Sequence, residues 1–301
     1  MTYSIVARCP DTGQLGVAVQ SHFFGTGAVV PWLEAGVGAV ATQAMAEIAH
    51  GPDGLARLRA GRAPAEALRD ILDPDDAAAT RQVAIVDATG RAAVHTGALC
   101  IQHAGHVVGD GFTVQANMME GPGVPEAMAA SFSAGSGPLA LRLVDALDAA
   151  QAAGGDIRGQ QSAAVKVVAG QPAAQAGHDG LLDVRVEDHP DPLGEIRRLV
   201  GLGLAYRRME EAEEAMTRGD LDAAIAIYAD SAGQQPAHHE FPFWHAVLLA
   251  GLGRGDEARA VAAPVFARPD GERWRELVRR LPAAELLPEE SVAVLLDDHR
   301  S

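Results

Sequence analysis

Lysine is almost absent from this chain of 301 residues: Lys166 is the only one, so arginine carries nearly all of the positive charge. The formal net charge is −16 at pH 7. Nucleic acids and anionic membrane surfaces are bound by clustered Lys and Arg, so this composition argues against both as partners. Aromatic residues make up 4% of the chain and hydrophobic residues 48%, which predicts a core packed mainly with small side chains.

Cysteine and long apolar runs are also scarce. Cys9 and Cys100 have no metal-binding or redox spacing, which predicts two reduced thiols. The chain has no run of ~20 apolar residues and no leader-like segment before its first predicted strand, so we expect a cytoplasmic protein. His50, His103 and His106 match no helical or hairpin ligand spacing. We therefore expect no metal and no other cofactor.

The start of the chain is its most informative feature. Met1 precedes Thr2, which opens the apolar segment TYSIVAR. A Met before a small residue is usually removed, and removal leaves Thr2 with a hydroxyl and a free α-amine, the nucleophile and base of the N-terminal threonine hydrolases. An α-amine titrates near ~7.7–8.0 and is therefore an available base at neutral pH. Ser4 lies on the same strand face and is the fallback nucleophile. The alternative is that the Met-Thr start has no catalytic meaning, because many proteins begin with Met-Thr and then a strand.

Predicted strands and pairs of helices alternate along the first 198 residues. Turn signals and β-rich apolar runs predict strands at 2–10, 13–21, 27–32, 36–44, 111–119, 161–170 and 181–188, and a further hairpin over 81–97. Apolar residues at three- and four-residue spacing predict helices at 54–61, 63–72, 124–133 and 138–154, with a helical pattern from Met45 onward. This order favours an α+β sandwich over a doubly wound parallel sheet.

The chain changes character near residue 198 and is predicted to be helical from Leu199 to about residue 298. The segment GDLDAA at 219–224 recurs loosely as GRGDEA at 253–258, a separation close to the tetratricopeptide period of ~34 residues. A tail helix over 291–300 is a candidate cap. We expect a first domain over 1–198 and a tetratricopeptide-like helical-repeat domain over 199–301 that recognises protein. A generic helical appendage is the alternative.

Several separate motifs carry a family resemblance. The segments at 2–43, 154–164 (GGDIRGQQSAA) and 183–199 resemble the N-terminal-nucleophile-hydrolase-like bacterial family known as domain of unknown function 1028. The resemblance covers roughly residues 2–200 and implies the four-layer αββα fold. In the 183–199 segment, Asp191 and Pro192 are placed as the N-cap and first residue of a helix.

A more distant similarity to proteasome β-subunits places the site. It implies that the turn after the strand ending in Thr42 and Gln43 directs a backbone N–H at the developing oxyanion. Asp156 and Ser162 resemble the segments that orient the terminal amine in those peptidases. Two departures disfavour protease activity: Gln20 stands where the peptidases have an acidic residue, and their catalytic lysine has no counterpart.

Other polar residues are candidates for binding substrate. His22 follows a strand end beside the presumed site, and Asn117 ends another strand. Asp156, Arg158, Gln161 and Ser162 form a dense polar cluster in an apolar stretch, and buried polar groups need partners. The cluster is therefore either a structural network or part of the site, with Asp156 or Arg158 setting the protonation state of the α-amine. His22 could equally be a surface residue, and Asn117 could equally satisfy backbone groups.

The combined prediction is a hydrolase of amide bonds in a small molecule. Its catalytic residues are Thr2, Gln43, Asp156 and Ser162, and its substrate-binding residues are His22, Thr42, Asn117, Arg158 and Gln161. The alternative is a non-catalytic binding or scaffold protein on a vestigial hydrolase fold. The short repeat array further suggests a homodimer.

Overall fold

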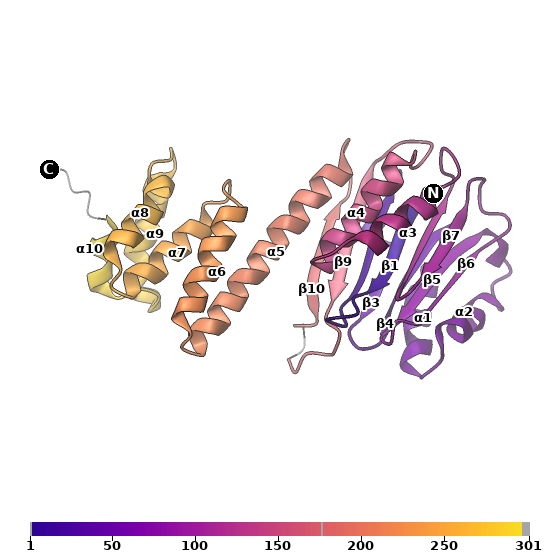
Figure 1. The fold of residues 1–301 in the computed structure, drawn as a ribbon, viewed down its shortest axis with the longest axis horizontal. Helices are drawn as coiled ribbons and strands as arrows, with labels where there is room; N and C mark the ends of the chain where they lie inside the picture. The colour runs from indigo at the N-terminus through magenta and orange to yellow at the C-terminus, as the bar shows by residue number, and fades with distance from the viewer. Residues whose placement is uncertain (1, 176, 297–301) are drawn as a thin grey trace. The chain divides into compact units, whose positions relative to one another are not determined.

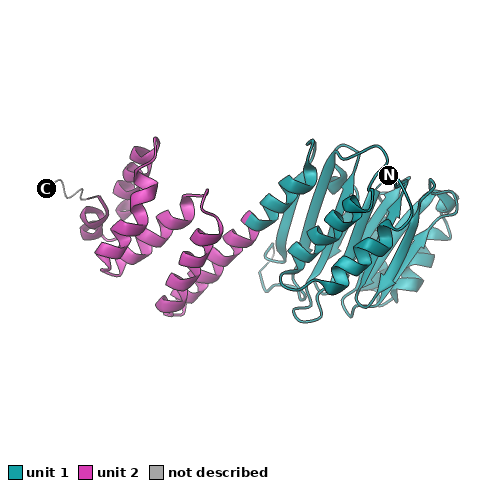
Figure 2. Cartoon of the chain, turned by 45° about the horizontal axis from the view of Figure 1, so that its top comes forward, with its two compact units in different colours: residues 1–201 teal, residues 202–301 magenta. Residues whose placement is uncertain are grey.

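A computed structural model describes residues 2–175 and 177–296. It contains two compact units, residues 1–201 and 202–301 (Figure 2). The sequence predicts the boundary at 198/199. Helix α5, Pro192–Thr217, begins in the first unit and ends in the second. It starts at the predicted position, where the Gly194 N–H donates to Asp191 Oδ1 at 3.0 Å.

The first unit contains two antiparallel sheets, so the mixed α+β class is confirmed (Figure 1). One sheet has the order β10-β9-β2-β1-β8-β7 and the other the order β3-β4-β5-β6. The strands are β1 Thr2–Arg8, β2 Leu15–Ser21, β3 Pro31–Glu34, β4 Gly38–Ala44, β5 Arg81–Asp87, β6 Ala92–Thr96, β7 Gly105–Gly109, β8 Phe112–Asn117, β9 Ser162–Val168 and β10 Gly180–Val186.

Apolar residues between the sheets and under the helices form the core of this unit. Small side chains such as Val6, Val17 and Ala84 fill the space between the two sheets. The helices are α1 His50–Arg59, α2 Pro64–Leu72, α3 Val124–Ala134 and α4 Leu139–Ala152. Helices α1 and α2 share a hydrophobic cluster with β4 and β5, and α4 contacts β1, β2 and β9. Gly16 of β2 lets α4 approach closely, because an added Cβ would lie 2.6 Å from Leu143 Cδ1.

Three local predictions for the first unit differ from the structure. The strand predicted at 27–32 begins only at Pro31, because the Val29 and Val30 N–H groups both donate to the Thr26 carbonyl and close a turn. The helical pattern predicted from Met45 begins only at His50, because residues 45–49 form a loop. Strand β7 is not predicted, since Gly105 and Gly109 bound a five-residue segment at a sheet edge with little apolar pattern. Neither Cys9, which is buried, nor Cys100, which is half-buried, is part of a disulfide in this structure.

The second unit is helical in the part of it that the structure describes. After α5 it contains α6 Leu221–Gln234, α7 Glu240–Gly251, α8 Gly255–Phe266, α9 Gly271–Arg280 and α10 Glu289–Leu296. The loosely repeated motif lies at the starts of α6 and α8, and Asp220 caps α6 by accepting from the Ala223 N–H at 3.2 Å. Part of the predicted tail helix, residues 297–300, lies outside the described residues.

Two apolar clusters hold the helices of this unit together. Phe241, Tyr228 and Ala212 belong to one, and Phe243, Phe266 and other side chains of α7 to α10 form the other. Across the described residues, no helix has both the length and the apolar character needed to cross a bilayer.

Candidate functional site

Thr2 is the first residue of β1, which has β2 on one side and β8 on the other. It pairs with Ser21 of β2 and with Asn117 of β8, and it is 4% exposed. Its hydroxyl donates to Ser21 Oγ at 3.1 Å. Its carbonyl oxygen accepts from Gln43 Nε2 and from Asn117 Nδ2, both at 3.3 Å. The structure thus brings together three predicted site residues, Thr2, Gln43 and Asn117.

A network of buried amide side chains lies between the sheets beside Thr2. Gln82 Oε1 accepts from Gln43 Nε2 and from Asn117 Nδ2, each at 2.8 Å, and therefore joins the two sheets. Ser4 donates to Gln43 Oε1 at 2.7 Å and accepts from Gln115 Nε2 at 2.5 Å. A buried polar group without a partner costs about 1–3 kcal/mol, so these mutual contacts fix the pairing of the sheets at this end.

Ser21, Gln82 and Gln115 are contacts of this site that the sequence did not single out. A weak signal exists, since each is a polar residue in a mainly apolar strand, on the face that points between the sheets. Gln20, which stands where the peptidases have an acidic residue, pairs with Tyr3, and its side chain lies on the other face of the sheet. Ser21 therefore occupies the position beside Thr2.

Asp156 and Ser162 hold the loop that follows β2. Asp156 accepts from the His22 backbone N–H at 3.2 Å and forms an ion pair with Arg158 at 2.8 Å. Ser162 donates to the Phe23 carbonyl at 2.6 Å and accepts from the Thr26 N–H at 3.2 Å. Ser162 lies two strands away from Thr2 along the sheet, because it pairs with Ser21, which pairs with Thr2. These contacts are those of a structural network.

Two predicted site residues face other partners. The Gln161 side chain donates to Asp188 Oδ1 at 3.1 Å. Thr42 lies on the opposite face of β4 from Gln43, and its hydroxyl donates to the Glu47 carbonyl at 3.0 Å. Thr42 therefore contributes by holding the 45–49 loop.

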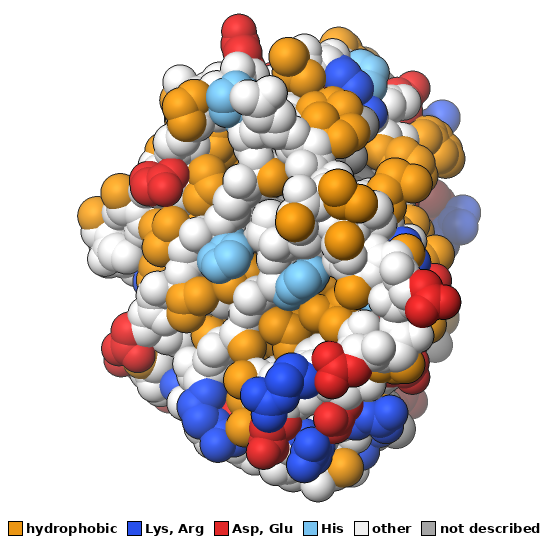
Figure 3. Space-filling view, turned by 90° about the vertical axis from the view of Figure 1, so that its right-hand side faces the viewer, with side chains coloured by type: hydrophobic (Ala, Val, Ile, Leu, Met, Phe, Trp, Pro, Cys, Tyr) orange, Lys and Arg blue, Asp and Glu red, His pale blue; other side chains and the backbone are white. Residues whose placement is uncertain are grey.

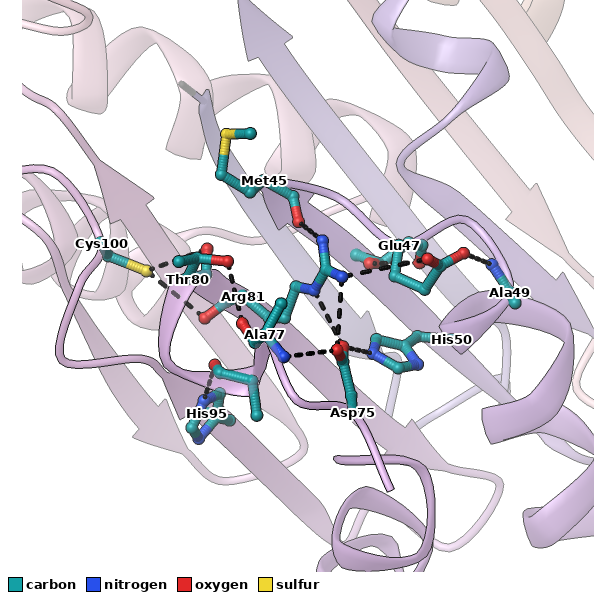
Figure 4. A network of polar contacts seen from close by, with 12 residues as sticks. Met45, Glu47, Ala49, His50, Asp75, Ala77, Thr80, Arg81, His95 and Cys100 are labelled. Atoms are coloured by element: carbon teal, nitrogen blue, oxygen red, sulfur yellow. Dashed lines mark hydrogen bonds and ion pairs between the residues drawn. The ribbon is translucent and has the colours of Figure 1, made fainter. Parts of the chain in front are cut away.

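The 45–49 loop is fixed by an ion-pair cluster (Figure 4). Arg81 donates to the Met45 carbonyl and to Asp75 Oδ2, the latter at 2.8 Å. His50, which is 5% exposed, contacts the same carboxylate through Nε2 at 2.9 Å. The hydrogen bond from Arg81 is the main cause that holds the pKa of Asp75 well below its usual range, against the effect of desolvation. Among the described residues, no group of three His, Cys, Asp or Glu side chains has an arrangement that could hold a metal ion.

Backbone strain concentrates at this end of the first unit. Ala44, His103 and Met118 all have positive φ, at 68°, 57° and 56°, which costs a non-glycine residue of order 1–3 kcal/mol. Ala44 directly follows Gln43, and Met118 directly follows Asn117. The Met118 N–H donates to the Ile101 carbonyl at 3.1 Å, so neighbouring loops hold one another in these conformations.

Large apolar side chains surround the same end. Among the described residues of the first unit, every strongly exposed large hydrophobic side chain except Val108 lies on a loop at the Thr2 end of the strands. These residues, called the apolar rim below, are Phe23, Phe24, Met45, Ile48, Leu99, Ile101 and Ile157. Figure 3 views the first unit from the right of Figure 1; charges gather along its lower border, where α1 and α2 lie, and the area above is mostly uncharged.

Lys166, the lone lysine, lies away from Thr2. It pairs in the sheet with Val17, which in turn pairs with Val6, and its Nζ lies 3.4 Å from Asp183 Oδ2. In the described part of the chain, the side-chain contact of the Thr2 hydroxyl is Ser21. Any base for Thr2 must therefore come from elsewhere than a lysine.

Comparisons with known proteins identify the family of this chain. A family model described as a family of unknown function, DUF1028, matches residues 2–196, and the chain belongs to that family. The crystal structure of protein SPO2555 from Silicibacter pomeroyi, of the same family, is 31% identical, with a TM-score of 0.60 over 66% of this chain and 84% of that one.

Anbu (ancestral beta-subunit) from Yersinia bercovieri is more distant, at 13% identity and a TM-score of 0.33 over 68% of this chain and 96% of that one. No curated protein matches the chain. The family resemblance read from the sequence is thus confirmed, while the N-terminal-nucleophile character, the tetratricopeptide-like repeats and the activity stay predictions.

Proposed function

We propose that the first unit hydrolyses an amide C–N bond in a small molecule, with Thr2 as an N-terminal nucleophile once Met1 is removed. Met1 lies outside the described residues. The observation that carries the proposal is the position of Thr2: it heads a central strand, its hydroxyl contacts Ser21, and Gln43 and Asn117 hold its carbonyl. A nucleophile must be held in this way before it can attack efficiently.

The proposed chemistry uses two groups of one residue. The α-amine of Thr2 takes the hydroxyl proton while Oγ1 attacks the amide carbonyl carbon. A backbone N–H at the turn after Gln43 stabilises the oxyanion, and the α-ammonium then gives its proton to the leaving amine. Water hydrolyses the resulting ester on Oγ1 and regenerates the free hydroxyl. The left-handed Ala44 supports a role for this turn, because strained backbone is often found at active sites.

Asp156 and Arg158 form an ion pair in the loop beside Thr2. Asp156 is the acidic group of the adjacent loop, and Arg158 neutralises it through contacts to both carboxylate oxygens. A paired carboxylate stabilises a nearby ammonium less than a free one does. We assign Asp156 and Arg158 this electrostatic role, and Ser162 a positioning role through the loop at Phe23.

The apolar rim supports an uncharged substrate with an apolar group. Its loops lie at the end of the two sheets where Thr2, Gln43 and Asn117 are found, and exposed apolar side chains gathered at one end of a molecule commonly mark a binding site. The packing of α1 and α2 on one sheet and of α4 on the other supports the four-layer αββα arrangement as part of the same proposal.

The experiment is a screen of neutral amides, ureides and N-acyl compounds against wild type, Thr2→Ser and Thr2→Ala, with intact mass of each protein measured first. Ala and Ser both permit removal of Met1, so all three samples share one N-terminal processing state. We expect hydrolysis by wild type, weaker hydrolysis by Thr2→Ser, and a loss of at least ~10³-fold in Thr2→Ala. Unchanged activity in Thr2→Ala would contradict the proposal.

One observation favours a second candidate, a non-catalytic binding protein on the same fold. Among the described residues no lysine, histidine or carboxylate contacts the Thr2 hydroxyl, and the amides around it are already paired with one another. Full retention of Met1 would support this candidate, because Thr2 would then have no free amine.

A further inference from the structure

The helical unit carries an apolar groove of about 600 Å³ that the proposed hydrolase does not use. Residues of α5, α6 and α7, together with one residue of the segment before α10, line it. The lining residues include Met209, Glu213, Met216, Leu221, Tyr228, Trp244, Leu252 and Leu286. All of them belong to the second unit, so the groove is complete within that unit. Its volume lies in the range of ligand-binding clefts.

The groove collects the exposed apolar side chains of its unit. Among the described residues, every strongly exposed large hydrophobic side chain of this unit except Tyr206 lines it. These are Met216, Leu221 and Leu252, each 38% exposed, and Leu286, 56% exposed. Single exposed apolar residues are ordinary on protein surfaces, whereas a contiguous group around a cleft marks a docking site.

Glu213 is the charged residue in the lining. Its neighbours on α5, Glu210 and Glu214, form ion pairs with Arg207 and Arg218. No hydrogen bond or ion pair to the Glu213 carboxylate is present in the described part of the chain. Burial and then the charge of Glu213 raise the pKa of Tyr228 to about 12, which places this phenol in the same electrostatic environment. The groove therefore offers an apolar surface with one uncompensated negative charge.

We propose that this groove binds a segment of a partner protein that presents two or three large apolar side chains beside a lysine or arginine. The apolar side chains match the walls, and the cation matches Glu213. Aromatic and long apolar side chains in such a cleft, here Tyr228 and Trp244, typically supply most of the binding free energy. An anionic lipid surface does not fit, because it would meet the unpaired carboxylate.

The test begins with selection of displayed random dodecapeptides on the full-length protein. We expect enriched sequences that share the apolar-plus-basic pattern, and the best peptide, synthesised, should change the fluorescence of Trp244 on binding. Its affinity, measured by calorimetry, should fall at least 30-fold in Leu252→Asp. Leu286→Asp provides a second variant at a more exposed position, and thermal unfolding of each variant verifies folding.

Charge exchange provides the specific control. The substitution Glu213→Lys should lower the affinity for the selected peptide at least tenfold. The same variant should bind more tightly than wild type a peptide whose basic residue is replaced by Glu. Glu214→Lys, one residue away and outside the groove, should change neither affinity by more than twofold. No enrichment, a selected peptide indifferent to Leu252→Asp, or equal effects of the two Lys variants would overturn the proposal. So would a wild-type dimer that Leu252→Asp dissociates, since the occupant would then be a second copy of the chain.

Discussion

The space beside Thr2 in the first unit and the helical core around Tyr228 and Phe241 differ in how their buried polar side chains are hydrogen-bonded. Between the sheets of the first unit, Gln43, Gln82 and Asn117 are almost completely buried and bond to one another and to the Thr2 carbonyl. In the helical unit, Ser231 Oγ and His245 Nε2 are buried without a hydrogen-bond partner among the described residues. Satisfied amides specify one arrangement of two sheets, whereas lone polar atoms in a helical core specify little.

Not every buried amide of the first unit has a hydrogen-bond partner. Gln20, on the face of the same sheet that lies toward α4, is buried with both side-chain atoms unpartnered in the described part of the chain. The paired amides are therefore a property of the space beside Thr2, rather than of the unit as a whole. This is the space in which the proposed chemistry needs a fixed backbone.

Among the substitutions that test this comparison, Gln82→Leu should have the largest effect on stability. The substitution removes the acceptor that joins Gln43 to Asn117 and leaves buried donors unpaired, so we expect a loss of about 3 kcal/mol of unfolding free energy. Urea denaturation measures the loss. The control is Gln161→Leu, at a surface amide that donates to Asp188. Its unfolding free energy should differ from that of wild type by no more than about 0.5 kcal/mol. Equal effects of the two changes would show that the network does not specify the fold.

The ion-pair cluster under the 45–49 loop should have a smaller effect that depends on pH. Asp75→Asn weakens its bonds to Arg81 and His50, and we expect a loss of about 2 kcal/mol at pH 7. Because the pKa of Asp75 is lowered by folding, its contribution is fully present above ~4 and disappears as the pH falls through the folded pKa. Unfolding measured from pH 7 to pH 2 should therefore show wild type and variant converging in acid. A constant difference would contradict this.

The apolar rim should affect substrate choice by a smaller amount. If the rim contacts the substrate, Phe24→Ser should lower kcat/KM for an N-octanoyl amide relative to its N-acetyl analogue by about fivefold, since fewer methylenes leave water. Val108→Ser, an equally simple change at an exposed apolar residue outside the rim, should leave the ratio unchanged. Steady-state kinetics with both amides on the two variants decide the matter.

The smallest effect is expected in the helical unit. Ser231→Ala removes a buried hydroxyl that has no partner in the described part of the chain, so stability should change by less than about 0.5 kcal/mol or increase. Urea denaturation, as for Gln82→Leu, measures this change in stability. A loss above 1 kcal/mol would mean that Ser231 is hydrogen-bonded, and the contrast between the two units would then disappear.

Local sequence patterns predicted most of the elements but only part of the site. Strands β1 and β2 follow from apolar runs around a turn, and the start of α5 follows from Asp191 and Pro192. Strand β7 could not be predicted in this way, because a short glycine-bounded edge strand is defined by its pairing with β8.

The Met-Thr start predicts Thr2, the similarity to proteasome β-subunits implies Gln43, and the end of a predicted strand suggests Asn117. Ser21, Gln82 and Gln115 join them through register and through packing of one sheet on the other, which no local pattern encodes. Gln20 and Ser21 show why the register matters. They are neighbours in β2, but only Ser21 pairs with Thr2, since a shift of one residue moves a side chain to the opposite face of the sheet.

The position of Lys166 has a practical consequence for chemical labelling. With its single lysine ion-paired to Asp183, the chain offers an acylating reagent two primary amines, the Lys166 Nζ and the N-terminal α-amine. An α-amine loses its proton at a lower pH than an ε-amine ordinarily does, so a reagent used near pH 7 reacts at the terminus first. Peptide mapping of such a sample reads directly whether that amine belongs to Met1 or to Thr2, and how reactive it is.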